Sequence, residues 1–97
     1  MTIAEFRDTL KLSAPPSVAP ALVALWHDAR GDWEAAHKVA QDVEDETGAW
    51  VHAYLHRKEG DLSNASYWYR HARKPVSSES LELEWEQIVT VLLSSEA

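Results

Sequence analysis

Residues 49–72 read AWVHAYLHRKEGDLSNASYWYRHA, and the fold class can be predicted from this stretch. Gly60 and Asp61 in its middle are a helix stop followed by an N-cap, because glycine commonly ends helices and aspartate begins them. The residues before this pair predict one helix over 48–59. Apolar residues at helical spacing after the pair predict a second helix over 61–73. The stretch is therefore a helical hairpin.

The remaining helices are predicted in the same way, from residues that commonly begin or end helices. Thr2 and Glu5 form a capping box, in which each side chain caps the backbone N–H of the other, at the start of an N-terminal helix. Pro20 suits the first turn of a second helix, and Gly31 ends it. Asp32 is a suitable N-cap for the helix that follows. Helices are thus predicted over residues 2–12, 20–30, 33 up to the polar stretch 42–47, 48–59, 61–73 and 79–93.

No part of the sequence alternates apolar and polar residues as a half-buried strand does. The predicted fold class is therefore all-α, with five to six short helices. A chain of 97 residues has the size of one domain. We expect a single domain over residues 1–97, in which two helix-turn-helix repeats are stacked between an N-terminal and a C-terminal helix.

The two helix-turn-helix units match each other in sequence when residues 20–43 are aligned with residues 49–72. The Gly-Asp pair recurs at the same place, and Ala36 takes the position of Ala65. A single unit of this kind cannot bury its apolar face alone, so copies stack. The alignment predicts that both alanines are buried where helices approach closely.

The second unit resembles a tetratricopeptide repeat. The residues that carry the resemblance are Gly60, Asp61, Leu62, Ala65, Tyr69, Ala72 and Pro75, with Ala53 in the preceding helix. Residues 24–33 and 50–57 also resemble small bacterial proteins of unassigned function. The tetratricopeptide resemblance implies a stack of helices that binds another protein or a peptide, with the first helix of each hairpin on the concave side.

Charge and composition exclude several classes of function. Nine Lys and Arg against sixteen Asp and Glu give a net charge of −7, which repels nucleic-acid phosphates. The absence of cysteine excludes disulfides and thiolate metal sites. No apolar run has the length of a membrane span or the character of a signal peptide. We therefore expect a cytoplasmic protein that binds neither nucleic acid nor membranes.

The concave face of the predicted stack offers aromatic and basic residues to a partner. The candidate binding residues are Leu25 and Asp28 from the first unit and Trp50, Tyr54, Arg57 and Lys58 from the second. A strip of this composition suits an acidic peptide. The alternative is that Trp50 and Tyr54 belong to the core, where the other four tryptophans are expected. A homodimer that buries an apolar patch is a further alternative.

Four histidines offer a candidate site of a different kind. His52 and His56 are one helical turn apart, a spacing that lets two imidazoles share a metal ion. His27 takes the position of His56 in the first unit, and His37 lies in the next helix. The alternative is that all four are packing or surface residues. Because no catalytic motif accompanies them, the sequence favours a binding module without a cofactor over an enzyme. A metal-binding protein or metalloenzyme is the alternative.

Overall fold

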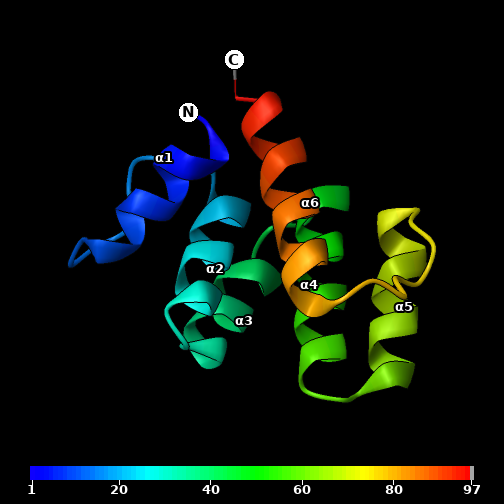
Figure 1. Cartoon of the computed structure of the whole chain (residues 1–97). Helices are drawn as coiled ribbons and strands as arrows, with labels where there is room; N and C mark the ends of the chain where they lie inside the picture. Colours follow the sequence, from blue (N-terminus) through cyan, green and yellow to red (C-terminus); the bar gives the residue numbers. More distant parts are fainter. Residues whose placement is uncertain (97) are drawn as a thin grey trace.

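The regular elements within residues 1–96, which are the residues that this computed structural model describes, are all helices (Figure 1). The all-α prediction is confirmed, with about six helices and no strand in this range. None of these helices is long and apolar enough to cross a bilayer. The elements are α1 (Ile3–Asp8), the 3-10 turn η1 (Thr9–Lys11), α2 (Pro20–Ala29), α3 (Trp33–Gln41), α4 (Glu46–Lys58), α5 (Leu62–Ala72) and α6 (Leu81–Ser94).

The two helical hairpins, α2–α3 and α4–α5, are closed by turns of the same geometry. Gly31 and Gly60 have φ angles of 82° and 88°, a left-handed conformation that glycine adopts without steric cost. Asp32 and Asp61 follow, and each accepts a hydrogen bond from a backbone N–H in the first turn of the next helix. The predicted pairs of helix stop and N-cap are therefore confirmed in both turns.

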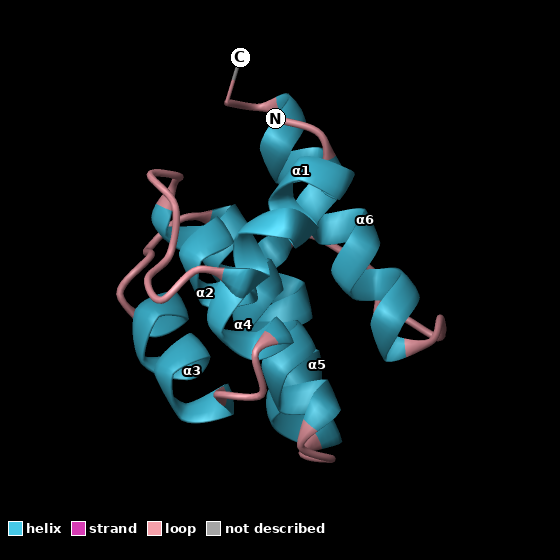
Figure 2. Cartoon of the chain, turned by 60° about the vertical axis from the view of Figure 1, so that its left-hand side comes forward, coloured by secondary structure: helices cyan, strands magenta, loops and turns pink. Residues whose placement is uncertain are grey.

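The hairpins pack against each other through α3 and α4, and α6 lies across α2 and α4 (Figures 1 and 2). Arg73 ends α5 in the left-handed conformation, with a φ angle of 58°. The segment 73–80 then leads the chain back over the hairpins. The short α1 contacts α6. The last helix therefore covers a face that α2 and α4 would otherwise leave open.

The hydrophobic core lies between α2, α4 and α6. Its largest fully buried apolar side chains are Trp26, Phe6, Leu22, Leu25, Leu55, Ile88, Val51 and Val89. A smaller cluster of Ala53, Ala65 and Tyr69 joins α4 to α5. Ala36 and Ala65 are both buried, as the alignment of the two hairpins predicts.

The five tryptophans divide into two groups. Trp26 and Trp85 lie in the core, as predicted. Trp33 and Trp68, which were expected there as well, are half-buried, and they stack on the rings of His37 and His52. Trp50 is half-buried too, and the Lys74 ammonium lies 4.3 Å from the centre of its ring. The large aromatic residues thus fill the core only in part, and three of them border polar groups.

Two helices begin two residues away from the start that the sequence predicts. α4 begins at Glu46, before the predicted residue 48, because the Asp45 side chain caps it by accepting a hydrogen bond from the Gly48 N–H at 3.0 Å. α6 begins at Leu81, after the predicted residue 79, because Ser80 is its N-cap. Capping side chains decide both starts.

Candidate functional site

Most of the predicted peptide strip is covered by α6: of its six residues, only Lys58 is exposed, and Trp50 and Arg57 are half-buried. Leu25, Asp28 and Tyr54 are buried, and Tyr54 has an exposed fraction of only 2%. The indole N–H of Trp85 on α6 donates a hydrogen bond to the Leu25 carbonyl at 3.1 Å. The expectation of an open face on α2 and α4 is therefore wrong, because the C-terminal helix of the chain packs on that face.

Glu84 of α6 supplies the acidic group that the strip contacts. This carboxylate is 1% exposed. Arg57 Nε donates to it at 3.0 Å, the Tyr69 hydroxyl at 2.7 Å and Trp50 Nε1 at 3.3 Å. Burial and the bond to Glu84 raise the pKa of Tyr69, so its hydroxyl stays protonated and donates. An interaction that the sequence assigns to an acidic partner is thus made within the chain.

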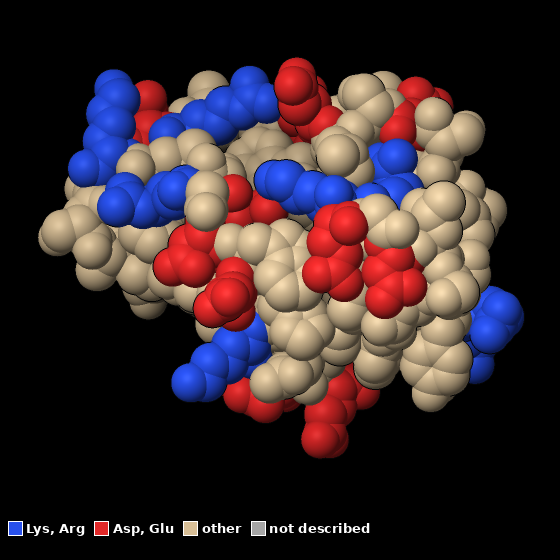
Figure 3. All heavy atoms as spheres, turned by 90° about the horizontal axis from the view of Figure 1, so that it is seen from below, with Lys and Arg blue, Asp and Glu red and all other residues tan. Residues whose placement is uncertain are grey.

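The other polar residues of the strip form a second contact beside α6. Lys58 Nζ and the Tyr54 hydroxyl each donate to the Asp28 carboxylate at 2.8 Å. These residues, with Arg7 and Trp85, line a hollow of about 530 Å³. On the face drawn in Figure 3, basic and acidic side chains lie next to one another. Charge alone therefore does not mark a docking surface on that face.

Three of the four candidate histidines converge where α3 meets α4. His37 belongs to α3, and His52 and His56 belong to α4. Each offers a ring nitrogen, and the three nitrogens lie within 4.8 Å of one another. The Nε2 atoms of His37 and His52 are 2.9 Å apart. His27 lies on α2 with its ring against Trp26, and it is not part of this group.

A carboxylate orients one ring of this histidine cluster, which we define as His37, His52 and His56. Glu59 Oε1 lies 2.9 Å from His56 Nδ1, and the His56 side chain is almost fully buried. When Nδ1 donates its proton to the carboxylate, the lone pair of the neutral ring is on Nε2. Metal-binding histidines in proteins almost always make such a bond through the nitrogen that does not bind the metal.

Two tryptophans hold the other rings of the cluster. Trp33 stacks on His37, with ring centres 4.9 Å apart and planes 8° from parallel. Trp33 is itself fixed by a hydrogen bond of 2.8 Å from its Nε1 to the Leu55 carbonyl. Trp68 stacks on His52 at 4.0 Å and 15°. The imidazoles therefore lie between aromatic walls that limit their rotation.

The surroundings of His37 and His52 favour the uncharged form of these two imidazoles. Burial, followed by the neighbouring His37 and His56, lowers the pKa of His52 from 6.5 to about 4. Burial and His56 also lower the pKa of His37. At neutral pH, each of these two rings is therefore neutral and has one nitrogen lone pair, which is the form that binds metals.

The spacing of the nitrogens is close to that of a metal site. A tetrahedral zinc ion with Zn–N bonds of about 2.0–2.1 Å holds its ligand nitrogens about 3.3 Å apart. The Nε2 atoms of His37 and His52 are slightly closer, at 2.9 Å, and the whole cluster fits within 4.8 Å. Zinc binding would therefore require small shifts of the rings that bring the three nitrogens to about 3.3 Å from one another.

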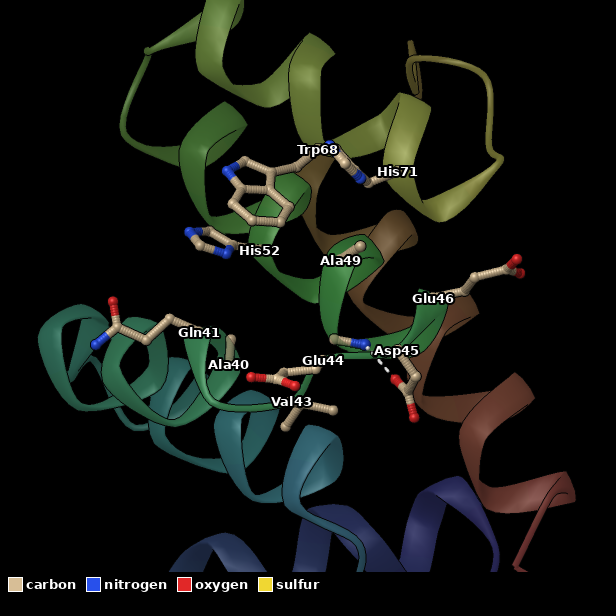
Figure 4. A pocket seen from close by; sticks show the side chains of 11 residues that line it. Ala40, Gln41, Val43, Glu44, Asp45, Glu46, Ala49, His52, Trp68 and His71 are labelled. Carbon is tan, nitrogen blue, oxygen red and sulfur yellow. Dashed lines mark hydrogen bonds between the residues drawn. The ribbon is translucent and has the colours of Figure 1, made fainter.

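A hollow of about 470 Å³ adjoins the cluster on the side of His52 and Trp68 (Figure 4). The connection between α3 and α4, which includes Glu44, forms the opposite wall, and His71 of α5 lies near Trp68. His71 is not a member of the cluster. The His52 side of the cluster therefore borders open space rather than packed core.

Three residues of the site, Glu59, Trp33 and Trp68, were not predicted from the sequence. The sequence spacing of each one relative to a histidine of the cluster indicates its position. Glu59 follows His56 by one helical turn, and Trp33 precedes His37 by one turn, so each pair shares a helix face. Trp68 follows Gly60 by the same number of residues by which His52 precedes it. Residues at equal sequence distance from the turn of a helical hairpin lie opposite each other, so this spacing places Trp68 near His52.

The function of the chain has to be inferred from this geometry, since a fold alone does not define a function. The resemblance to tetratricopeptide repeats stays a prediction. In comparisons with known proteins, no family model, no curated protein and no solved structure matches the chain.

Proposed function

We propose that this protein binds one divalent transition-metal ion through His37, His52 and His56. The observation that carries the proposal is the convergence of three ring nitrogens, from two helices, within 4.8 Å of one another. Two of the three side chains are buried. Imidazole ligands suit zinc, copper, iron and nickel. Zinc is the ion for a first test, because three histidines are a common zinc ligand set.

Two features support metal binding over simple packing. Packing requires no convergence of lone pairs, and buried polar atoms are normally satisfied by donors rather than by other acceptors. In this cluster, one proton can lie between the Nε2 atoms of His37 and His52, and His56 is bonded to Glu59 through Nδ1. A metal ion would take the place of the shared proton, which would move to Nδ1 of the same ring, and one lone pair of each of the three rings would then bind the metal.

The test is the metal content of protein purified without a metal-binding tag. After equilibrium dialysis against micromolar Zn²⁺ at pH 7.5, we expect one zinc per chain by elemental analysis. His37→Gln is the first variant, because this side chain is only half-buried and its loss disturbs the packing least. His56→Gln is the second. Both should lose most of the bound zinc while circular dichroism shows the helices unchanged.

His27→Gln and His71→Gln are the matched controls, because both histidines lie outside the cluster. Both control variants should keep one zinc per chain. Native protein that retains no zinc, or cluster variants that retain as much as the controls, would overturn the proposal. Bound zinc should also raise the melting temperature of the native protein, because a ligand that binds only the folded state stabilises it.

Binding of an acidic protein or peptide is the second candidate function. The hollow beside α6 is the place for it, because Lys58 and Arg7 lie in its wall next to Trp85. An acidic peptide would have to displace Asp28 and Glu86, which pair with these two cations. Synthetic acidic peptides titrated against the protein should change the tryptophan fluorescence, and Lys58→Gln should weaken this response. If no peptide of such a panel gives a saturable change, this function is excluded for the hollow.

A further inference from the structure

The number of protein ligands decides what a bound metal can do. Structural zinc sites are closed by four protein ligands, whereas catalytic sites have three and bind water or substrate in the fourth position. Within residues 1–96, no fourth histidine, aspartate or glutamate joins the three nitrogens of the histidine cluster. The chain has no cysteine that could complete the set.

Glu59 is the nearest carboxylate, and its position rules it out as a fourth ligand of the same ion. Its Oε1 atom lies against Nδ1 of His56, and Glu59 groups with His56 and Asp61 but not with His37 and His52. Nε2 of His56 is therefore the nitrogen that remains for the metal ion of the cluster. The lone-pair directions of the two ring nitrogens diverge, so a group bonded at Nδ1 lies on the far side of the ring from the metal. Glu59 therefore orients His56 and increases the basicity of Nε2.

The residues of the cluster differ in how accessible they are to solvent. His56 and His52 are buried, but His37 is half-buried, and the hollow of about 470 Å³ reaches His52. The flanking tryptophans are themselves half-buried, so the aromatic walls extend to the protein surface. The hollow therefore brings a small ligand to the His52 side of the cluster.

We propose that the metal ion in the histidine cluster has one open coordination position, which takes water or a single small monodentate anion from solution. This inference rests on the proposed metal binding. A metal in such a site acidifies its bound water, to a pKa near 7 for zinc bound by three histidines. The site would then hold a metal-bound hydroxide at neutral pH, which is the nucleophile of hydrolytic and hydration reactions.

The test uses Co²⁺ in place of zinc, because its visible spectrum reports the number and kind of ligands. Co²⁺-loaded native protein is titrated with sodium azide at constant ionic strength and pH 7.5. We expect a saturable change in the visible absorption bands with a stoichiometry of one azide per cobalt. Glu59→Ala should show the same azide response, with cobalt affinity lowered about 10–100-fold.

The outcomes separate this inference from the proposed function. Cobalt bound in a one-to-one ratio, with a spectrum that azide does not change, would show a closed site and would overturn the inference while leaving metal binding intact. An azide response in Glu59→Ala but not in the native protein would make Glu59 the fourth ligand and would also overturn it. Native protein that binds no cobalt overturns the proposed function, and the inference with it.

Discussion

The buried carboxylate of Glu84 allows a quantitative test of how α6 is held. Glu84→Gln keeps the size of the side chain and removes its charge. The Arg57 side chain, which is 14% exposed, then stays in place without its counter-ion. Removing one partner of a buried ion pair costs about 3–5 kcal/mol. Because glutamine still offers an acceptor to the Tyr69 hydroxyl, we expect the low end of this range, a loss of about 3 kcal/mol in the free energy of unfolding.

The same helix provides the control. Glu86 pairs with Arg7 at 2.8 Å, but the side chain of Glu86 is 43% exposed. Exposed ion pairs contribute less than about 1 kcal/mol, so Glu86→Gln should change the stability little. Urea unfolding followed by circular dichroism gives both free energies. In thermal unfolding, Glu84→Gln should lower the melting temperature by about 12–24 °C. If the two variants differ by less than about 1 kcal/mol, the buried network does not hold α6 as described.

Two further predictions concern packing and pH. Ala65→Leu should lower the free energy of unfolding by about 1–3 kcal/mol, because Ala65 is buried where α5 packs against α4. Ser63→Leu, on the exposed side of α5, should change the free energy of unfolding by less than about 0.5 kcal/mol. Equal effects of the two substitutions would contradict the close approach of α4 and α5. The metal-free protein should lose up to about 3 kcal/mol as the pH falls from 6.5 to 4, because the pKa of His52 is lowered to about 4 in the fold and the unfolded chain takes up the proton first. Urea unfolding at several pH values should show this loss in the native protein and a smaller one in His52→Gln, and identical profiles would contradict it.

Local signals in the sequence predicted the helices because their causes are local. Gly31 and Gly60 need no distant contact to end a helix, and the aspartates after them cap the next one. Gly48 shows the limit of this reasoning. It reads as a separator between helices, but it lies in the first turn of α4. A Cβ atom at this position would lie 2.0 Å from the Val43 carbonyl oxygen. Glycine is needed there because two segments approach closely, which the local sequence does not show.

The location of α6 could not be predicted for a similar reason. Arg57, which was expected to meet an acidic group of a partner, donates instead to Glu84 of the same chain, as Trp50 does. Tyr54 donates to Asp28. The acidic character of the last helix is visible in the sequence. What the sequence does not show is the path of residues 73–80, which carries that helix over α2 and α4.

The central position of α4 explains why the histidine cluster, rather than the strip, is the candidate site. This helix packs against α2, α3, α5 and α6, so polar side chains on more than one of its faces are buried. A buried polar group without a partner is costly. On the side of α4 that faces α6, the polar groups have hydrogen-bond partners, because Arg57 donates to Glu84 and Tyr54 donates to Asp28.

On the side of α4 that faces α3, the buried polar side chains are histidines, and their neighbours are mainly other histidines. The rings of His52 and His37 share one proton at most, and His56 is bonded only through Nδ1. Three imidazole nitrogens lie within 4.8 Å of one another, a convergence that packing alone does not require. The arrangement is explained if a cation occupies the cluster, and the zinc content of the His37→Gln and His27→Gln variants measures this directly.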